Sequence, residues 1–126
     1  MAKRKTKKGV IRTFTTGATR NIDSNKFDYE GFNSPFVEQR FAQYMHGHRK
    51  QKDGTTRASD NWQNGIPNDV YMKSIKRHIQ DLHLLHRGGK PIDPDTGKPC
   101  TIENLLCAIR FNVNGYLHEE LQVEKK

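Results

Sequence analysis

Residues 68–87 carry the pattern that most constrains the fold of this chain. Apolar side chains recur there at a helical period and, at 100° per residue, fall within about 80° of one another. Asn68 or Asp69 can cap the start of such a helix, and Gly88–Gly89 can end it. The sequence therefore predicts a helix over 68–87. The residues of its buried face are Tyr71, Ile75, Leu82 and Leu85.

Two other segments show helical start signals and apolar faces. Ser34–Pro35 places a hydroxyl cap before a proline at the first helical position, which predicts a helix over 35–48. Thr101 caps a third helix over 102–121. Its apolar face consists of Leu105, Leu106, Ile109, Val113, Tyr116 and Leu117. Because no segment shows a convincing strand pattern, we expect an all-α protein, a small bundle of three main helices with long ordered loops.

The two long connections, residues 49–67 and 88–100, are rich in polar and turn-forming residues. Connections of this length in a compact domain are either functional or disordered. Trp62, the only tryptophan in the chain, lies in the first of them and favours a loop that is anchored to the core.

Charge is distributed very unevenly along the 126 residues, which carry a formal net charge of +8. Met1 to Arg20 holds seven basic residues and no acidic one. We therefore expect a flexible basic tail over 1–21 and a single helical domain over 22–126. Such a tail binds nucleic acid or an acidic protein without a reading helix. Its basic residues before Arg20 are Lys3, Arg4, Lys5, Lys7, Lys8 and Arg12.

The cysteine pattern and the lack of long apolar runs bear on location. Cys100 and Cys107 lack the CxxC spacing, and no run approaches the roughly 18 apolar residues of a membrane span. We expect a reduced, cytoplasmic protein that does not bind membranes. Apolar residues make up only 33% of the chain, and this shortage of core favours a homo-oligomer.

A polar seam borders the buried face of the 68–87 helix. Ser74, His78 and Asp81 lie one turn apart, and His78 and Asp81 are neighbours on the helix surface. Two interpretations stay open, a histidine satisfied within the core and an acid–base group beside a pocket. His83 lies about 140° around the helix from His78, which disfavours a zinc site and leaves His83 and His86 in solvent.

Five short pieces in a fixed order carry a resemblance to a known family. They are Gly17–Arg20 (GATR), Asn61–Gly65 (NWQNG), Ser74–His78 (SIKRH), the acidic loop Asp93–Gly97, and Asn112. Together they resemble the phage and bacterial family described as the N-terminal domain of dATP/dGTP diphosphohydrolases. The likeness extends from about Gly17 to Glu119.

This resemblance implies hydrolysis of a purine deoxynucleoside triphosphate to monophosphate and pyrophosphate, with Mg²⁺ or Mn²⁺, in a phage-infected bacterial cell. The substrate-binding residues would be Arg20, Asn61, Trp62, Arg77 and Asn112, and the catalytic residues His78 and Asp81. For the metal we infer Asp81, Asp95 and Glu103, because Mg²⁺ bound through phosphates needs only one or two carboxylates.

The sequence departs from the related MazG-like enzymes, which pair ExxE and ExxD motifs on neighbouring helices. Here the first helix offers Glu38 alone, the second offers Asp81 alone beyond its capping residues, and Glu103 stands near the position of a family histidine. Two alternatives therefore remain beside the enzyme. One is a non-enzymatic phage accessory protein that acts through its basic arm, and the other is a nucleotide sensor without turnover.

Overall fold

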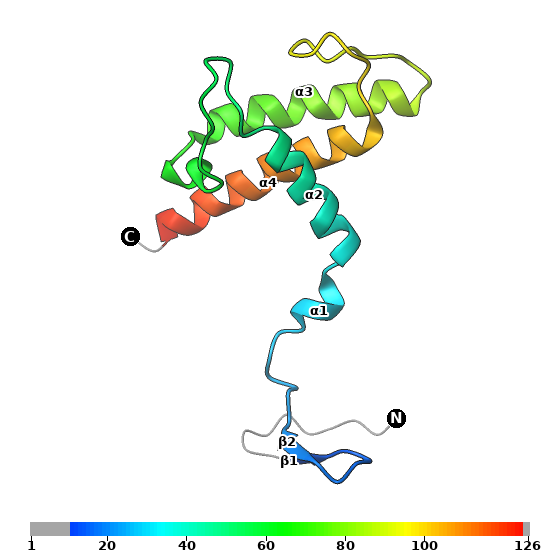
Figure 1. Ribbon diagram of the computed structural model, residues 1–126, viewed down its shortest axis with the longest axis vertical. Coiled ribbons are helices and arrows are strands. Elements are labelled where there is room, and N and C mark those ends of the chain that lie inside the picture. The colour runs from blue at the N-terminus through cyan, green and yellow to red at the C-terminus, as the bar shows by residue number, and fades with distance from the viewer. Residues whose placement is uncertain (1–10, 125–126) are drawn as a thin grey trace. The chain divides into compact units, whose positions relative to one another are not determined.

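The computed structural model describes residues 11–124 and is mostly helical (Figure 1). The predicted helices over 35–48, 68–87 and 102–121 are confirmed, with ends that differ by at most a few residues. The elements in chain order are β1 (Ile11–Thr13), β2 (Thr19–Asn21), α1 (Tyr29–Phe32), α2 (Pro35–Gly47), the 3-10 turn η1 (Asn61–Asn64), α3 (Asn68–His86) and α4 (Ile102–Glu124).

Side-chain caps explain where two of the helices begin. The Ser34 hydroxyl accepts a hydrogen bond from the Val37 N–H at 3.3 Å, and the Thr101 hydroxyl accepts one from the Asn104 N–H at 3.2 Å. Both predicted caps are confirmed. The cap predicted for α3 was wrong, because Pro67 precedes that helix and makes no side-chain cap. Asn68 is already inside the first turn, where its amide donates to Glu120 Oε1 at 2.9 Å.

The expectation of a purely α-helical chain was wrong at residues 11–21, which form a two-stranded antiparallel hairpin. Ile11 pairs with Asn21, and Arg12 pairs with Arg20. The turn closes through the Phe14 N–H, which donates to the Ala18 carbonyl at 2.8 Å, and through Gly17 at φ +89°. Three-residue strands are too short to show an apolar alternation, so the sequence pattern missed them. Lys3 to Lys8 of the predicted tail lie outside the described residues.

Contacts within the chain divide it into two units after Val37. The hairpin and α1 belong to the first unit. The second unit contains α3, α4 and α2 from Glu38 onward, together with both long loops.

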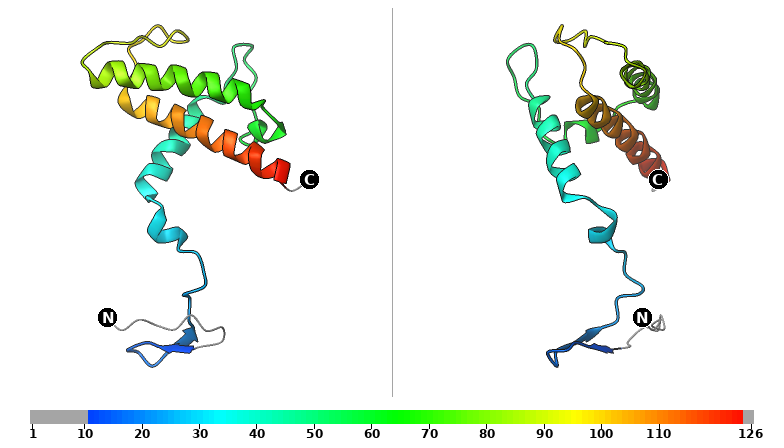
Figure 2. Two further views of the ribbon diagram at one scale, coloured as in Figure 1. Left: turned by 180° about the vertical axis from the view of Figure 1, so that it is seen from behind. Right: turned by 90° about the vertical axis from the view of Figure 1, so that its right-hand side faces the viewer.

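The core of the second unit lies where α3 packs against α4, which run side by side in both views (Figures 1 and 2). Tyr71 of α3 is 1% exposed, and Leu105 and Ala108 of α4 are also buried. A Cβ at Gly115 would overlap the Tyr71 ring, so the absent side chain is what admits this ring. The Phe111 ring packs against the Tyr71 ring in a T-shaped arrangement, at 6.0 Å between centroids.

The apolar face predicted for the third helix needs a correction. Leu105 is buried as expected, but Leu106, Val113 and Leu117 are about half exposed. Helix α4 meets α3 instead through a narrower row of small and polar residues beside Leu105. That row consists of Ala108, Asn112 and Gly115.

No helix within residues 11–124 is long and apolar enough to cross a membrane.

Candidate functional site

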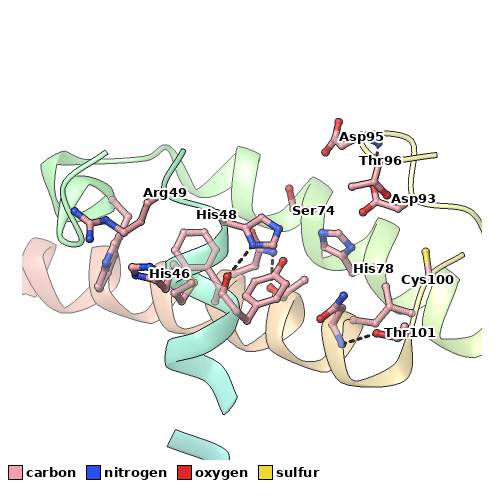
Figure 3. A pocket seen from close by; sticks show the side chains of 18 of the residues that line it. His46, His48, Arg49, Ser74, His78, Asp93, Asp95, Thr96, Cys100 and Thr101 are labelled. Carbon is pink, nitrogen blue, oxygen red and sulfur yellow. Dashed lines mark hydrogen bonds between the residues drawn. The ribbon is translucent and has the colours of Figure 1, made fainter. Parts of the chain in front are cut away.

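A cleft of about 1020 Å³ opens in the second unit (Figure 3). Its walls come from the end of α2, the loop that leads to η1, the middle of α3, the loop before α4 and the first half of α4. Its polar and charged lining includes His46, His48, Arg49, Arg57, Ser74, Arg77, His78, Asp81, Asp93, Asp95 and Asn104.

Most of the sequence pieces that resemble the hydrolase family meet in this cleft. Asn61 and Trp62 of η1 line it, as do Ser74, Arg77 and His78 of the SIKRH piece. Asp81, the acidic loop through Asp93 and Asp95, and Asn112 also line it. These pieces lie up to 51 positions apart along the chain, so the fold rather than sequence proximity brings them together.

Two predicted site residues do not line this cleft. Arg20 lies on β2, in the first unit. Glu103 lies in the first turn of α4, where its carboxylate accepts from Arg40 Nε at 2.6 Å. Arg12, assigned to the basic arm, forms an ion pair with Asp23 at 3.0 Å within the first unit.

His78 is half-buried, and its Nδ1 is a buried atom without a hydrogen-bond partner among the described residues. This nitrogen therefore donates no hydrogen bond to the neighbouring Asp81 carboxylate. Burial lowers the pKa of His78 below its ordinary value of 6.5, and the charge of Arg77 adds to this effect. Asp81, Asp93 and Asp95 oppose the shift. The imidazole is consequently neutral at pH 7 and holds a lone pair that can accept a proton.

We expect the free energy of unfolding to fall as the pH is lowered through 6.5. In that range the unfolded chain takes up a proton at residue 78 that the folded chain binds less readily, so stability rises with pH. Urea unfolding between pH of about 8 and about 5 measures this slope. The slope should be smaller in His78→Gln and unchanged in His83→Gln, whose side chain is exposed. Equal slopes in both variants would contradict the assignment to His78.

His48 is a cleft residue that the sequence interpretation did not select. Its Nδ1 donates to the Tyr44 carbonyl at 2.8 Å, and its ring stacks on Tyr44 at 4.1 Å between centroids. Because a carbonyl oxygen only accepts, the neutral ring carries its proton on Nδ1 and keeps Nε2 as an acceptor. Burial raises the pKa of Tyr44 to about 12, so its phenol stays protonated. The only signal in the sequence was the four-residue spacing of Tyr44 and His48 in a predicted helix. Such a spacing is too common to indicate a site.

The first long loop is held in a definite shape beside the cleft. The Arg57 N–H donates to the Arg49 carbonyl at 2.8 Å, and Arg49 Nε returns a bond to the Arg57 carbonyl at 2.8 Å. Trp62 packs its ring against His118 at 4.8 Å and Phe111 at 6.3 Å between centroids. The predicted anchoring of this loop by Trp62 is confirmed.

Charge changes sign along the cleft, as Figure 3 shows. Arg49 and His46 lie toward one end, Asp93 and Asp95 toward the other, and His48, Ser74 and His78 lie between them. The acidic loop is closed by the Asp93 N–H, which donates to the Lys98 carbonyl at 2.8 Å. Asp93 Oδ1 also accepts from the Asp95 N–H at 2.9 Å.

The carboxylates of the cleft suit a metal ion only when phosphates supply its other ligands. Within residues 11–124 no three His, Cys, Asp or Glu side chains stand close enough to hold a metal ion by themselves. Mg²⁺ requires no such cage when it arrives with phosphates, because one or two carboxylates then complete its shell. Asp81, Asp93 and Asp95 supply carboxylates of that kind to the cleft.

No family model, no curated protein and no solved structure matches the chain.

Proposed function

We propose that the cleft binds a purine deoxynucleoside triphosphate and hydrolyses it to the monophosphate and pyrophosphate. One observation carries the proposal. The NWQNG and SIKRH pieces, the acidic loop and Asn112 are scattered along the sequence, yet they line one cleft that also holds arginines and carboxylates.

The arginines of the cleft match the charge of a triphosphate. Arg77 lies on α3 beside His78, and Arg49 and Arg57 extend from the fixed loop. A guanidinium group donates two parallel hydrogen bonds to phosphate oxygens, which gives both affinity and orientation. We assign substrate binding to these three residues, together with Asn61, Trp62 and Asn112.

The negative charge at the acidic end of the cleft suits a metal ion that is also bound by the phosphates. One or two of Asp81, Asp93 and Asp95 would hold Mg²⁺ or Mn²⁺, which would offset negative charge on the phosphate oxygens when bound. Glu103 is left out of this set because it is engaged by Arg40.

His78 is the general base of the proposed reaction. A water oxygen attacks the α-phosphorus, the bond from that phosphorus to the α,β-bridging oxygen breaks, and pyrophosphate leaves. The water proton passes to the neutral imidazole of His78. Asp81, which favours the charged form of this imidazole, stabilises the imidazolium that results. The stacked rings of Tyr44 and His48 provide an aromatic surface for the purine.

The test is incubation of the purified protein with each of the four dNTPs and Mg²⁺ or Mn²⁺, followed by chromatography of the products. We expect monophosphate and pyrophosphate from dATP and dGTP. Calorimetric titration of each nucleotide separates binding from turnover. If a nucleotide binds but no products form, the proposed function changes from hydrolysis to nucleotide sensing. If the protein shows no binding and forms no products, the nucleotide cleft is rejected. The partners of the basic arm would then be examined.

A further inference from the structure

The outer side of α4 carries a continuous row of aliphatic side chains. Five of them are between 46% and 56% exposed, and Ile109 in their midst is half-buried. At 100° per residue they fall within a sector of about 120° and run the length of the helix. We call this row the α4 stripe. Its members are Ile102, Leu106, Ile109, Val113, Leu117 and Leu121.

The other sides of α4 are already occupied within the second unit. Leu105, Ala108 and Asn112 face the packing with α3, which makes the most extensive contacts of any pair of elements in the described chain. Toward α2, Arg110 lies over the Phe41 ring at 4.3 Å and donates to Glu38 at 2.6 Å. The α4 stripe is a third, apolar side that neither packing uses.

Three charged side chains that lie among or beside the members of the α4 stripe are paired inside the chain. Glu103 is paired with Arg40 at 2.6 Å, Arg110 with Glu38 at 2.6 Å, and Glu120 accepts from Asn68 at 2.9 Å. Glu103, Arg110 and Glu120 therefore offer no free counter-charge to an acidic or basic partner. A second apolar helix whose own charges are already paired would bury the stripe without leaving a charge unpaired.

The exposed apolar area of the α4 stripe is large enough for the apolar centre of an interface. With about half of five aliphatic side chains exposed, it offers on the order of 500 Å² of apolar surface, against about 800 Å² that each partner buries in a standard interface, rim included. The core that the second unit builds alone is small, since its buried apolar side chains within the described residues are Tyr71, Leu105, Cys107 and Ala108.

We propose that the α4 stripe is the interface of a homodimer, in which the α4 helices of two copies pack antiparallel. A two-fold axis makes one surface self-complementary, so each stripe supplies the apolar helix side, with its charges already paired, that the other requires. In this arrangement the axis passes near Val113, and the Ile102 end of one stripe meets the Leu121 end of the other.

The test is the molar mass of the full chain in solution, measured by light scattering on a sizing column at several concentrations. We expect a dimer, about twice 14.6 kDa, and a monomer for Val113→Lys. Ile79→Lys is the matched control, because Ile79 is 45% exposed on α3 and Val113 is 46% exposed on α4. Circular dichroism checks that each variant keeps its helices, and Leu117→Lys repeats the test at a second position.

Mixing provides a test of self-complementarity. Val113→Lys and Val113→Glu should each be monomeric alone and should dimerise together, because the axis places the two residues 113 near each other. A monomeric wild-type chain would overturn the proposal, as would a dimer that survives both Val113→Lys and Leu117→Lys. Loss of the dimer in Ile79→Lys but not in Val113→Lys would place the interface elsewhere and overturn it too.

Discussion

Gly115→Ala is expected to lower the free energy of unfolding by about 3 kcal/mol, at the upper end of what overpacking a core costs. The new Cβ would overlap the ring of Tyr71, which is 1% exposed and cannot move toward solvent without opening the contact between α3 and α4. Urea unfolding followed by circular dichroism measures the change.

Gly47→Ala is the matched control for this prediction. Gly47 is also helical, but a Cβ added there meets no atom within 4 Å, so the variant should be as stable as the wild type or slightly more stable. A double variant with Tyr71→Leu should recover part of the loss, because the smaller side chain makes room for the methyl group. Equal stability of Gly115→Ala and the wild type would show that the two helices do not meet at this ring.

His78→Gln is expected to lower kcat/KM for dATP or dGTP by about 100-fold or more, the usual contribution of a general base. Glutamine fills a similar space and keeps a hydrogen-bonding group, but it cannot accept the proton of the attacking water. The loss should fall on kcat rather than on KM, because Arg77 and the loop arginines remain to bind the phosphates. Steady-state kinetics on both purine nucleotides measure it.

His83→Gln controls for this substitution on the same helix. His83 is exposed and does not line the cleft, so its replacement should leave both kinetic constants near the wild-type values. Asp81→Asn should cause a smaller loss than His78→Gln, of about tenfold, since Asp81 acts through the charge it places beside the imidazole. Full activity in His78→Gln would assign the base to another group, and His48, with Nε2 as an acceptor, is the next candidate.

Local signals in the sequence predicted the helices well. Ser34 and Thr101 each place a hydroxyl before a helical pattern, and both accept the expected backbone N–H. Trp62 stood out as the one large aromatic residue of a polar loop, and it does attach that loop to α4. These features depend on residues close together in the chain, which is why they could be predicted without a fold.

The candidate site was predicted in part. His78, Asp81, Arg77 and the acidic loop were selected from the helix pattern and the resemblance, and the fold brings them to one cleft. His48 was missed because its role depends on the end of α2 and the middle of α3 lining the same cleft. Glu103 was selected as one of three carboxylates for a metal bound through phosphates, but in the first turn of α4 it is engaged by Arg40.

The sequence by itself determined where α2 and α4 begin and which loops carry charge, because caps, proline and helical periodicity act within a few residues. Only the tertiary structure decided which side of α4 is buried. Both sides carry apolar residues, and the choice depends on Gly115, whose missing side chain lets the Tyr71 ring enter. The larger side chains Leu106, Val113 and Leu117 are left on the outer side, because the side that holds Gly115 is the one that faces the Tyr71 ring.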